Sequence, residues 1–273
     1  TMKTHNYCIA IHGGAGTLLR EKMDARLRKK YENALSAALD VGYAMLEGGG
    51  SALDAVVASV SALEDCPLFN AGRGSVFNAR GEHEMDAAIM SGKELGAGAV
   101  AAVRNVRNPI ELAAEVMMNS NHVFLSGKGA NDFAIKQGLK LEPDEYFFSQ
   151  FRYDQWKAIR DSDNYSLDHT HQGLEELFKD KKFGTVGAVA CDVDGNIAAA
   201  TSTGGMTNKK YGRILEISGD SLQITTIDNR YYRRNGKYYP SITSVLGMMP
   251  KGKFFDEWLM KFGFNSKIIA EKA

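Results

Sequence analysis

The spacing of hydrophobic residues changes several times along the chain, which predicts a mixture of helices and strands. Residues 7–12 form a short apolar run that predicts a buried strand leading into a glycine-rich turn. Residues 20–47 carry helical periodicity and stop at the three glycines of positions 48–50. Ser51, followed by Asp54 three residues later, predicts the start of a second amphipathic helix.

The middle of the chain continues this mixture. Asn108-Pro109 predicts another helix start, because proline suits the first helical position. Residues 122–125 predict a strand, and residues 128–138 predict a helix. From residue 142 to residue 182 the pattern weakens and predicts a polar surface segment.

Two strands are predicted after that segment, at residues 185–191 and 197–202, joined by a hairpin at Asp194-Gly195. Helices and strands therefore alternate without the regular order of a parallel βαβ fold. Such a mixture fits an α+β fold in which helical layers pack on a sheet.

Composition narrows the class of protein only slightly. The chain has 273 residues, with 33 basic and 33 acidic side chains, so its charge gives no reason to expect a nucleic-acid partner. It holds no run of 18 apolar residues, so we expect no membrane span. Three scattered cysteines predict neither a disulfide framework nor a zinc site. We expect a cytoplasmic protein, since no secretory leader pattern is present.

A threonine, Thr185, opens the first of the two late strands, directly after Gly184. If the bond between them is cut, Thr185 gains a free α-amine beside its hydroxyl, and this amine can serve as the base that activates the hydroxyl. An α-amine titrates near ~7.7–8.0, which suits a general base at neutral pH. A Gly-Thr pair before a strand is also a common strand start, so the dipeptide alone leaves both interpretations open.

Three further segments decide between them: IHGGAG at residues 11–16, CPLFNAGRG at residues 66–74 and TSTGGMTNK at residues 201–209. Together with Thr185, and in this order, they resemble the plant-type asparaginase / isoaspartyl aminopeptidase family of N-terminal-nucleophile hydrolases. The resemblance covers about residues 7–213. It implies a four-layer αββα sandwich and a chain that cleaves itself before Thr185.

The resemblance also implies the reaction. Thr185 Oγ would attack the Gly184 carbonyl during maturation, and later the side-chain amide of L-asparagine or of a β-aspartyl dipeptide, releasing aspartate. No cofactor would be needed for catalysis, and cleaved protomers would pair as a homodimer. Residues 1–184 would form the first part of the hydrolase domain, and residues 185–213 would begin the part that bears the nucleophile.

Three other residues match functional positions of the family. Thr203 matches a threonine whose hydroxyl lies beside the nucleophile, although a strand-end hydroxyl bonded to backbone would look the same. Arg213 matches the arginine that holds the substrate carboxylate, for which a guanidinium fork is suited; without the motif it would be a surface arginine. Asn70 matches an asparagine near the active centre, or it completes the turn before Ala71-Gly72.

Two glycine-rich or loop segments carry weaker predictions. The HGGAG segment lacks the lysine and the hydroxyl residue of a phosphate-binding loop, so its glycines predict close backbone packing near the threonine. The segment from residue 63 to residue 73 matches a family loop in which backbone carbonyls hold a structural sodium ion, and oxygen ligands suit such a hard cation. The predicted carbonyl donors are those of Leu63, Glu64, Cys66, Phe69, Ala71 and Arg73.

Residues 214–273 depart from the family. Gly219-Asp220-Ser221 lies further from Arg213 than the family's substrate element, and no later Thr-Gly pair supplies an oxyanion hole. Tyrosine-rich strands flank a hairpin at Asn235-Gly236, and the segment weakly resembles the N-terminal part of a phage PD-(D/E)XK nuclease. The sequence therefore predicts an incomplete sandwich with an unrelated tail. The alternatives to a hydrolase are a nucleic-acid-binding or nuclease-related module in this tail, and an inactive remnant.

Overall fold

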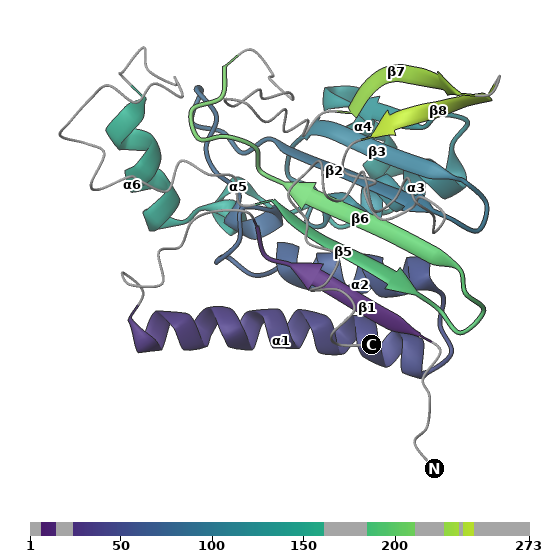
Figure 1. The fold of residues 1–273 in the computed structure, drawn as a ribbon. Helices are drawn as coiled ribbons and strands as arrows, with labels where there is room; N and C mark the ends of the chain where they lie inside the picture. Colours follow the sequence, from purple (N-terminus) through teal and green to yellow (C-terminus); the bar gives the residue numbers. More distant parts are fainter. Residues whose placement is uncertain (1–6, 15–23, 161–184, 211–226, 235–236, 243–273) are drawn as a thin grey trace.

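The computed structural model describes residues 7–14, 24–160, 185–210, 227–234 and 237–242. Its strands are β1 (Cys8–His12), β2 (Met85–Ser91), β3 (Ala97–Val103), β4 (Phe124–Ser126), β5 (Val186–Cys191), β6 (Ile197–Thr203), β7 (Ile227–Arg234) and β8 (Lys237–Ile242). The first six form one sheet in the order β1-β5-β6-β2-β3-β4 (Figure 1). All neighbours in it are antiparallel except β3 and β4, which are parallel.

The helices are α1 (Ala25–Glu47), α2 (Ala52–Glu64), α3 (Pro109–Asn119), α4 (Gly127–Lys136), α5 (Asp144–Phe147) and α6 (Gln150–Ile159), with a 3-10 turn at Gly72–Gly74. Helices α2 and α3 cover one face of the sheet, and α1 packs along α2 (Figure 1). Their buried residues, among them Val60, Leu63 and Ile110, form the main core against the alanine-rich strands. This mixed sheet with helices confirms the predicted α+β class.

The predicted end of the first helix and the predicted start of the second are confirmed, whereas the first helix begins at Ala25 rather than near residue 20. Asp24 caps the start of α1 by accepting the Leu27 amide at 2.6 Å, and Gly48 caps its end. At the start of α2, the Ser51 hydroxyl accepts the Asp54 amide at 3.1 Å, as the capping pattern predicts. In the ranges that the structure describes, none of the helices combines the length and the hydropathy that a bilayer crossing requires.

The prediction of a surface loop after residue 142 is wrong in that α5 and α6 are helices, whereas the surface position of α6 is confirmed, since none of its residues is buried. Helix α6 is held by aromatic contacts that a polarity pattern does not reveal: the Trp156 and Tyr153 rings lie 5.8 and 6.0 Å from the Phe77 ring. Aromatic pairs at such distances contribute beyond their buried area. Residues 161–184, including the rest of this predicted segment, lie outside the described residues.

Beyond the main sheet, β7 and β8 pair as an antiparallel hairpin, as predicted for the tyrosine-rich strands. The turn residues Asn235-Gly236 lie outside the described residues. The described ranges hold a single large sheet beside this hairpin, so the second sheet of a four-layer sandwich remains a prediction.

The hairpin between β5 and β6 turns at residues 192–196, which include the predicted Asp194-Gly195, and Asp192 braces this turn. Its buried carboxylate accepts four hydrogen bonds: from the amides of Asp194 and Asn196, from the Asn196 side chain, and from the Ala52 amide at the start of α2. Burial alone would raise the pKa of Asp192, but these bonds outweigh it and lower the pKa below its ordinary value. One side chain therefore ties the turn to the helical layer.

Asp192→Asn is expected to lose about 1–3 kcal/mol of unfolding free energy at pH 7, because its amide group would face donors. A carboxyl with a lowered folded pKa contributes stability above its unfolded value, near ~3.9, and loses it as the pH falls through the folded pKa. Urea unfolding at stepwise lower pH should therefore bring wild type and variant together. Asp194→Asn, at an exposed position of the same turn, serves as the control; a constant difference at every pH would contradict the assignment.

Candidate active site

The hairpin places two threonines side by side. Thr185 directly precedes β5, and Thr203 is the last residue of β6. Because the two strands are antiparallel, with Val186 opposite Ser202, the start of one lies beside the end of the other. Thr185 Oγ1 donates to Thr203 Oγ1 at 3.2 Å. The structure thus brings together the predicted nucleophile and its predicted neighbour, while Gly184 and Arg213 lie outside the described residues.

The turn after β6 fixes the Thr203 hydroxyl, which also accepts the Gly205 amide at 3.0 Å. Asn70 braces this turn: its Nδ2 donates to the Gly205 carbonyl at 2.7 Å, and its Oδ1 accepts the Val76 amide at 3.0 Å. Asn70 therefore both braces its own loop, through Val76, and reaches the turn after Thr203, through Gly205. Its role toward a substrate stays a prediction.

Successive side chains of β6 point to opposite faces of the sheet, which separates the hydroxyls of Thr201 and Ser202. Thr201 donates to the Val186 carbonyl at 3.0 Å, so its hydroxyl is used in the hairpin. Ser202 is fully buried and faces Glu64 on α2. Burial raises the pKa of Glu64 to about 8, and contacts with the Ser202 hydroxyl and the Ile110 amide offset only part of this rise. The raised pKa favours the neutral form of the Glu64 carboxyl group beside β6 at neutral pH.

His12 lies beside the threonine pair, although no pattern in the sequence singled it out. It ends β1 opposite Gly187, and a side-chain Cβ at Gly187 would collide with the imidazole. Crowding by neighbouring protein lowers the pKa of His12, although part of the residue stays exposed, and a hydrogen bond to the Thr185 backbone works in the opposite direction. The signal available in the sequence was its position at the head of the HGGAG segment.

The glycines of that segment allow the close packing that the sequence predicts. A Cβ at Gly13 would lie 2.5 Å from the Phe69 ring and 3.1 Å from Leu35. Gly14 has φ of 120°, a conformation that favours glycine. Gly13 therefore lets the end of β1 approach the loop that carries Asn70. Residues 15 and 16 of the segment lie outside the described residues.

The predicted sodium loop follows α2. A Cβ at Gly72, where φ is 50°, would lie 2.5 Å from the Glu64 carbonyl oxygen. A Cβ at Gly74 would collide with the carbonyl oxygen of Phe69. The carbonyls of these two predicted donors therefore pack directly against glycines of the loop, where a larger residue would not fit. Among the described residues, no group of three or more His, Cys, Asp or Glu side chains suits a metal ion, so any cation here would depend on carbonyl oxygens.

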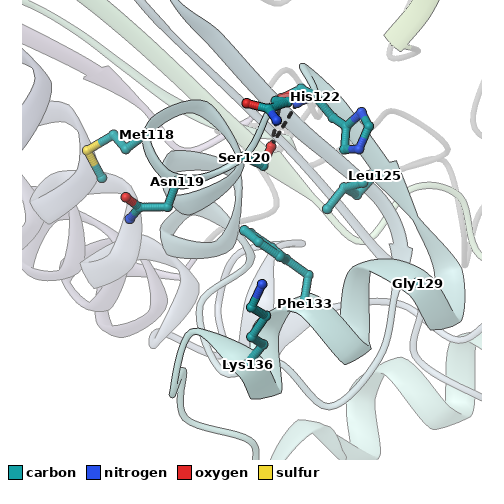
Figure 2. Close-up of a pocket in the computed structure, with 9 residues that line it drawn as sticks. Met118, Asn119, Ser120, His122, Leu125, Gly129, Phe133 and Lys136 are labelled. Atoms are coloured by element: carbon teal, nitrogen blue, oxygen red, sulfur yellow. Dashed lines mark hydrogen bonds between the residues drawn. The ribbon is translucent and has the colours of Figure 1, made fainter.

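A hollow of about 640 Å³ lies away from the threonine pair, between the end of α3, β4 and α4 (Figure 2). Strands β2 and β3 separate β4 from β6 in the sheet. Figure 2 shows Ser120 beside His122, where its hydroxyl accepts the His122 amide at 3.1 Å and donates to the carbonyls of Val116 and His122. Its hydroxyl is therefore occupied by backbone, and the hollow lacks the paired hydroxyls found between β5 and β6.

The mixed sheet covered by helices and the threonine pair together define an α+β protein with a candidate threonine nucleophile at the paired ends of β5 and β6. The family model described as asparaginase matches residues 5–225, and the chain belongs to this family. The predicted resemblance over about residues 7–213 is confirmed, and the match continues past residue 213. The nuclease resemblance of the tail stays a prediction.

Named relatives are similar over most of the chain. It is 50% identical over 213 residues to the isoaspartyl peptidase of Escherichia coli, covering 78% of this chain and 64% of the relative. It is 43% identical over 217 residues to the human isoaspartyl peptidase/L-asparaginase, covering 79% of this chain and 65% of the relative. The chain thus spans slightly less than two thirds of the length of these relatives.

Proposed function

We propose that this chain is a threonine-nucleophile amidohydrolase that releases aspartate from L-asparagine and from β-aspartyl dipeptides. The observation that carries the proposal is the 3.2 Å contact between the hydroxyls of Thr185 and Thr203 at the paired ends of β5 and β6. A nucleophile within hydrogen-bond reach of a second polar group is the usual arrangement of covalent catalysis. The names and the identity of the relatives support the same substrate class.

Maturation would begin when Thr185 Oγ attacks the carbonyl carbon of Gly184. The C–N bond breaks as the C–O bond forms, and water then hydrolyses the resulting ester, leaving a Gly184 carboxylate and a free Thr185 α-amine. In turnover, that amine takes the hydroxyl proton while Oγ attacks the side-chain amide of the substrate. Ammonia or an amino acid leaves, and water releases aspartate from the acyl-enzyme. In this proposal Arg213 holds the substrate carboxylate.

The proposal includes a structural sodium ion held by the predicted carbonyls of the loop after α2. The fold of this loop, in which Gly72 and Gly74 let backbone pack closely beside the Glu64 and Phe69 carbonyls, is compatible with it, and oxygen ligands suit a hard cation. Such an ion would stiffen the loop that carries Asn70 and would take no part in bond breaking.

Dimers of cleaved protomers and a cytoplasmic location complete the proposal. Among the described residues, Cys8 and Cys66 are not in disulfides, which fits a reducing compartment. Light scattering of the purified chain would show whether its mass in solution is that of one or of two copies.

The deciding experiment is the intact mass of the purified wild-type chain after incubation at neutral pH, followed by assays of ammonia release from L-asparagine and of aspartate release from β-aspartyl dipeptides. Two fragments that meet at Gly184 and Thr185, with release of product, are the expected result. An uncut chain without product release would overturn the proposal and favour an inactive member of the family.

A further inference from the structure

Lys209 is a buried lysine, only 5% exposed, at the end of the TSTGGMTNK segment. Its ammonium Nζ donates to the Glu84 carbonyl at 2.6 Å and to the Gly204 carbonyl at 3.1 Å. Lysine is seldom buried without a specific partner, and hydrogen bonds from an ionised donor are roughly twice as strong as neutral ones. The ammonium thus makes a strong contact with the turn that follows Thr203.

Every backbone amide and carbonyl of the two glycines in that turn, Gly204 and Gly205, forms a hydrogen bond. The Gly204 amide donates to the Asn70 carbonyl at 2.9 Å, and the Gly204 carbonyl accepts from Lys209. The Gly205 amide donates to Thr203 Oγ1, and the Gly205 carbonyl accepts from Asn70 Nδ2. The Gly204 carbonyl and the Gly205 amide belong to the same peptide group, so a positive charge at one end strengthens the donor at the other.

We propose that Lys209 is a positioning residue that polarises the Gly204–Gly205 peptide and, through it, the Thr203 hydroxyl that faces Thr185. This inference rests on the proposed function. The path has three links: Lys209 Nζ to the Gly204 carbonyl, the Gly205 amide to Thr203 Oγ1, and Thr203 Oγ1 to Thr185 Oγ1. A hydroxyl can accept and donate at once. When Thr185 loses its proton, Thr203 turns its own proton toward the developing negative charge.

Two carboxyl groups, those of Glu84 and Asp86, are the acidic groups to consider as competing partners of Lys209. Its carbonyl partner Glu84 directs its carboxylate to Arg80, at 2.6 Å. Asp86, opposite Thr203 in the sheet, accepts the Ala102 amide at 2.8 Å. Burial raises the pKa of Asp86 and the charge of Lys209 opposes that rise. Among the described residues, neither carboxylate forms an ion pair with Lys209, and the hydrogen bonds of its ammonium go to the two carbonyls, while its charge also acts on Asp86.

The first test compares Lys209→Met with Lys209→Arg in hydrolysis of L-asparagine. Loss of the charged donor is expected to lower kcat about ten- to hundredfold with KM nearly unchanged, the scale of one charge-assisted hydrogen bond. Arginine, which keeps a charged donor, should recover part of this loss. Lys128→Met is the control, because Lys128 is exposed on α4 and pairs only with Asp132 among the described residues. Equal kcat for wild type and Lys209→Met would overturn the proposal.

The second test needs no activity. In a Thr185→Ala background, the Gly205 amide proton resonance reports the strength of its bond to Thr203. The relay predicts an upfield shift in Lys209→Met, a smaller one in Lys209→Arg, and an upfield shift in Thr203→Val, which lacks the acceptor. An unchanged Gly205 resonance in Lys209→Met would overturn the relay. Should Lys209→Met fail to fold, scalar coupling from the wild-type Lys209 Nζ to the Gly204 carbonyl carbon replaces it, and absence of that coupling overturns the relay.

The two tests separate the two proposals. If the wild-type chain hydrolyses L-asparagine while Lys209→Met keeps both its kcat and its Gly205 resonance, the relay fails and the function stands. If the wild-type chain shows no hydrolysis, and the Gly205 resonance still moves as expected, the proposed function fails and the polarised turn stands.

Discussion

A Thr185→Ala chain is expected to remain uncut and to hydrolyse neither L-asparagine nor β-aspartyl dipeptides. The substitution removes the atom that attacks in both reactions, while the neighbouring strand β5 keeps its pairing with β1 and β6. Removal of the nucleophile lowers turnover on the order of 10⁶-fold in a serine protease, so we expect activity at background. Intact mass and ammonia release measure the two effects on one sample.

Two further variants make this result specific. Thr185→Ser keeps the hydroxyl and is expected to retain slow cleavage and measurable turnover. Thr201→Val removes a nearby hydroxyl whose partner among the described residues is the Val186 carbonyl, so this variant should cleave itself as wild type does. Product release by Thr185→Ala at the wild-type rate would show that another group is the nucleophile.

A second large effect is expected at Gly98, where β3 passes under α3. A Cβ at this position would collide with the Ala113 carbonyl and would lie 2.6 Å from the Met117 amide nitrogen. Both are backbone atoms of α3 and cannot rotate away, so the helix would have to move off the sheet. Overpacking of a core commonly costs ~1–3 kcal/mol, and we expect Gly98→Ala to cost at least about 3 kcal/mol because backbone must shift.

Urea unfolding at neutral pH measures this loss, and Gly129→Ala is the matched control. Gly129 lies in the first turn of α4, and its Cβ would meet nothing within 4 Å. Alanine favours helix over glycine by up to about 1 kcal/mol, so this variant should be as stable as wild type or more so. Equal midpoints for Gly98→Ala and wild type would contradict the packing of α3 on β3.

Local signals predicted the helices with caps but not every strand. The glycines after α1, the Ser51 cap and the Asn108-Pro109 start act within a few residues, so they appear directly in the sequence. Strands β2 and β3 consist largely of alanine, glycine and methionine, and nearly every position in them is buried. Residues of low strand propensity that are buried on both faces show no alternation, so their pairing is decided by the rest of the fold.

The residues of the site also fall into two groups, those that sequence motifs predict and those that only the fold brings together. Motif resemblance selected Thr185, Thr203 and Asn70, which the structure gathers around one turn. The same motif contains Lys209, yet its contact with the Gly204 carbonyl depends on how residues 204–209 fold back, and no spacing rule gives that. His12 reaches Thr185 only because β1 pairs with β5, which lies more than 170 positions further along the chain.

The strand order has a consequence for the cut protein. Strands β5 and β6 come after the proposed cleavage site, yet they lie between β1 and β2, which come before it. Two pieces produced at Thr185 would therefore share one continuous sheet, joined by backbone ladders on both sides of the later pair. Such pieces should migrate together under native conditions and separate only in denaturant. A successful cut would thus create a new chain terminus without creating a dissociable product.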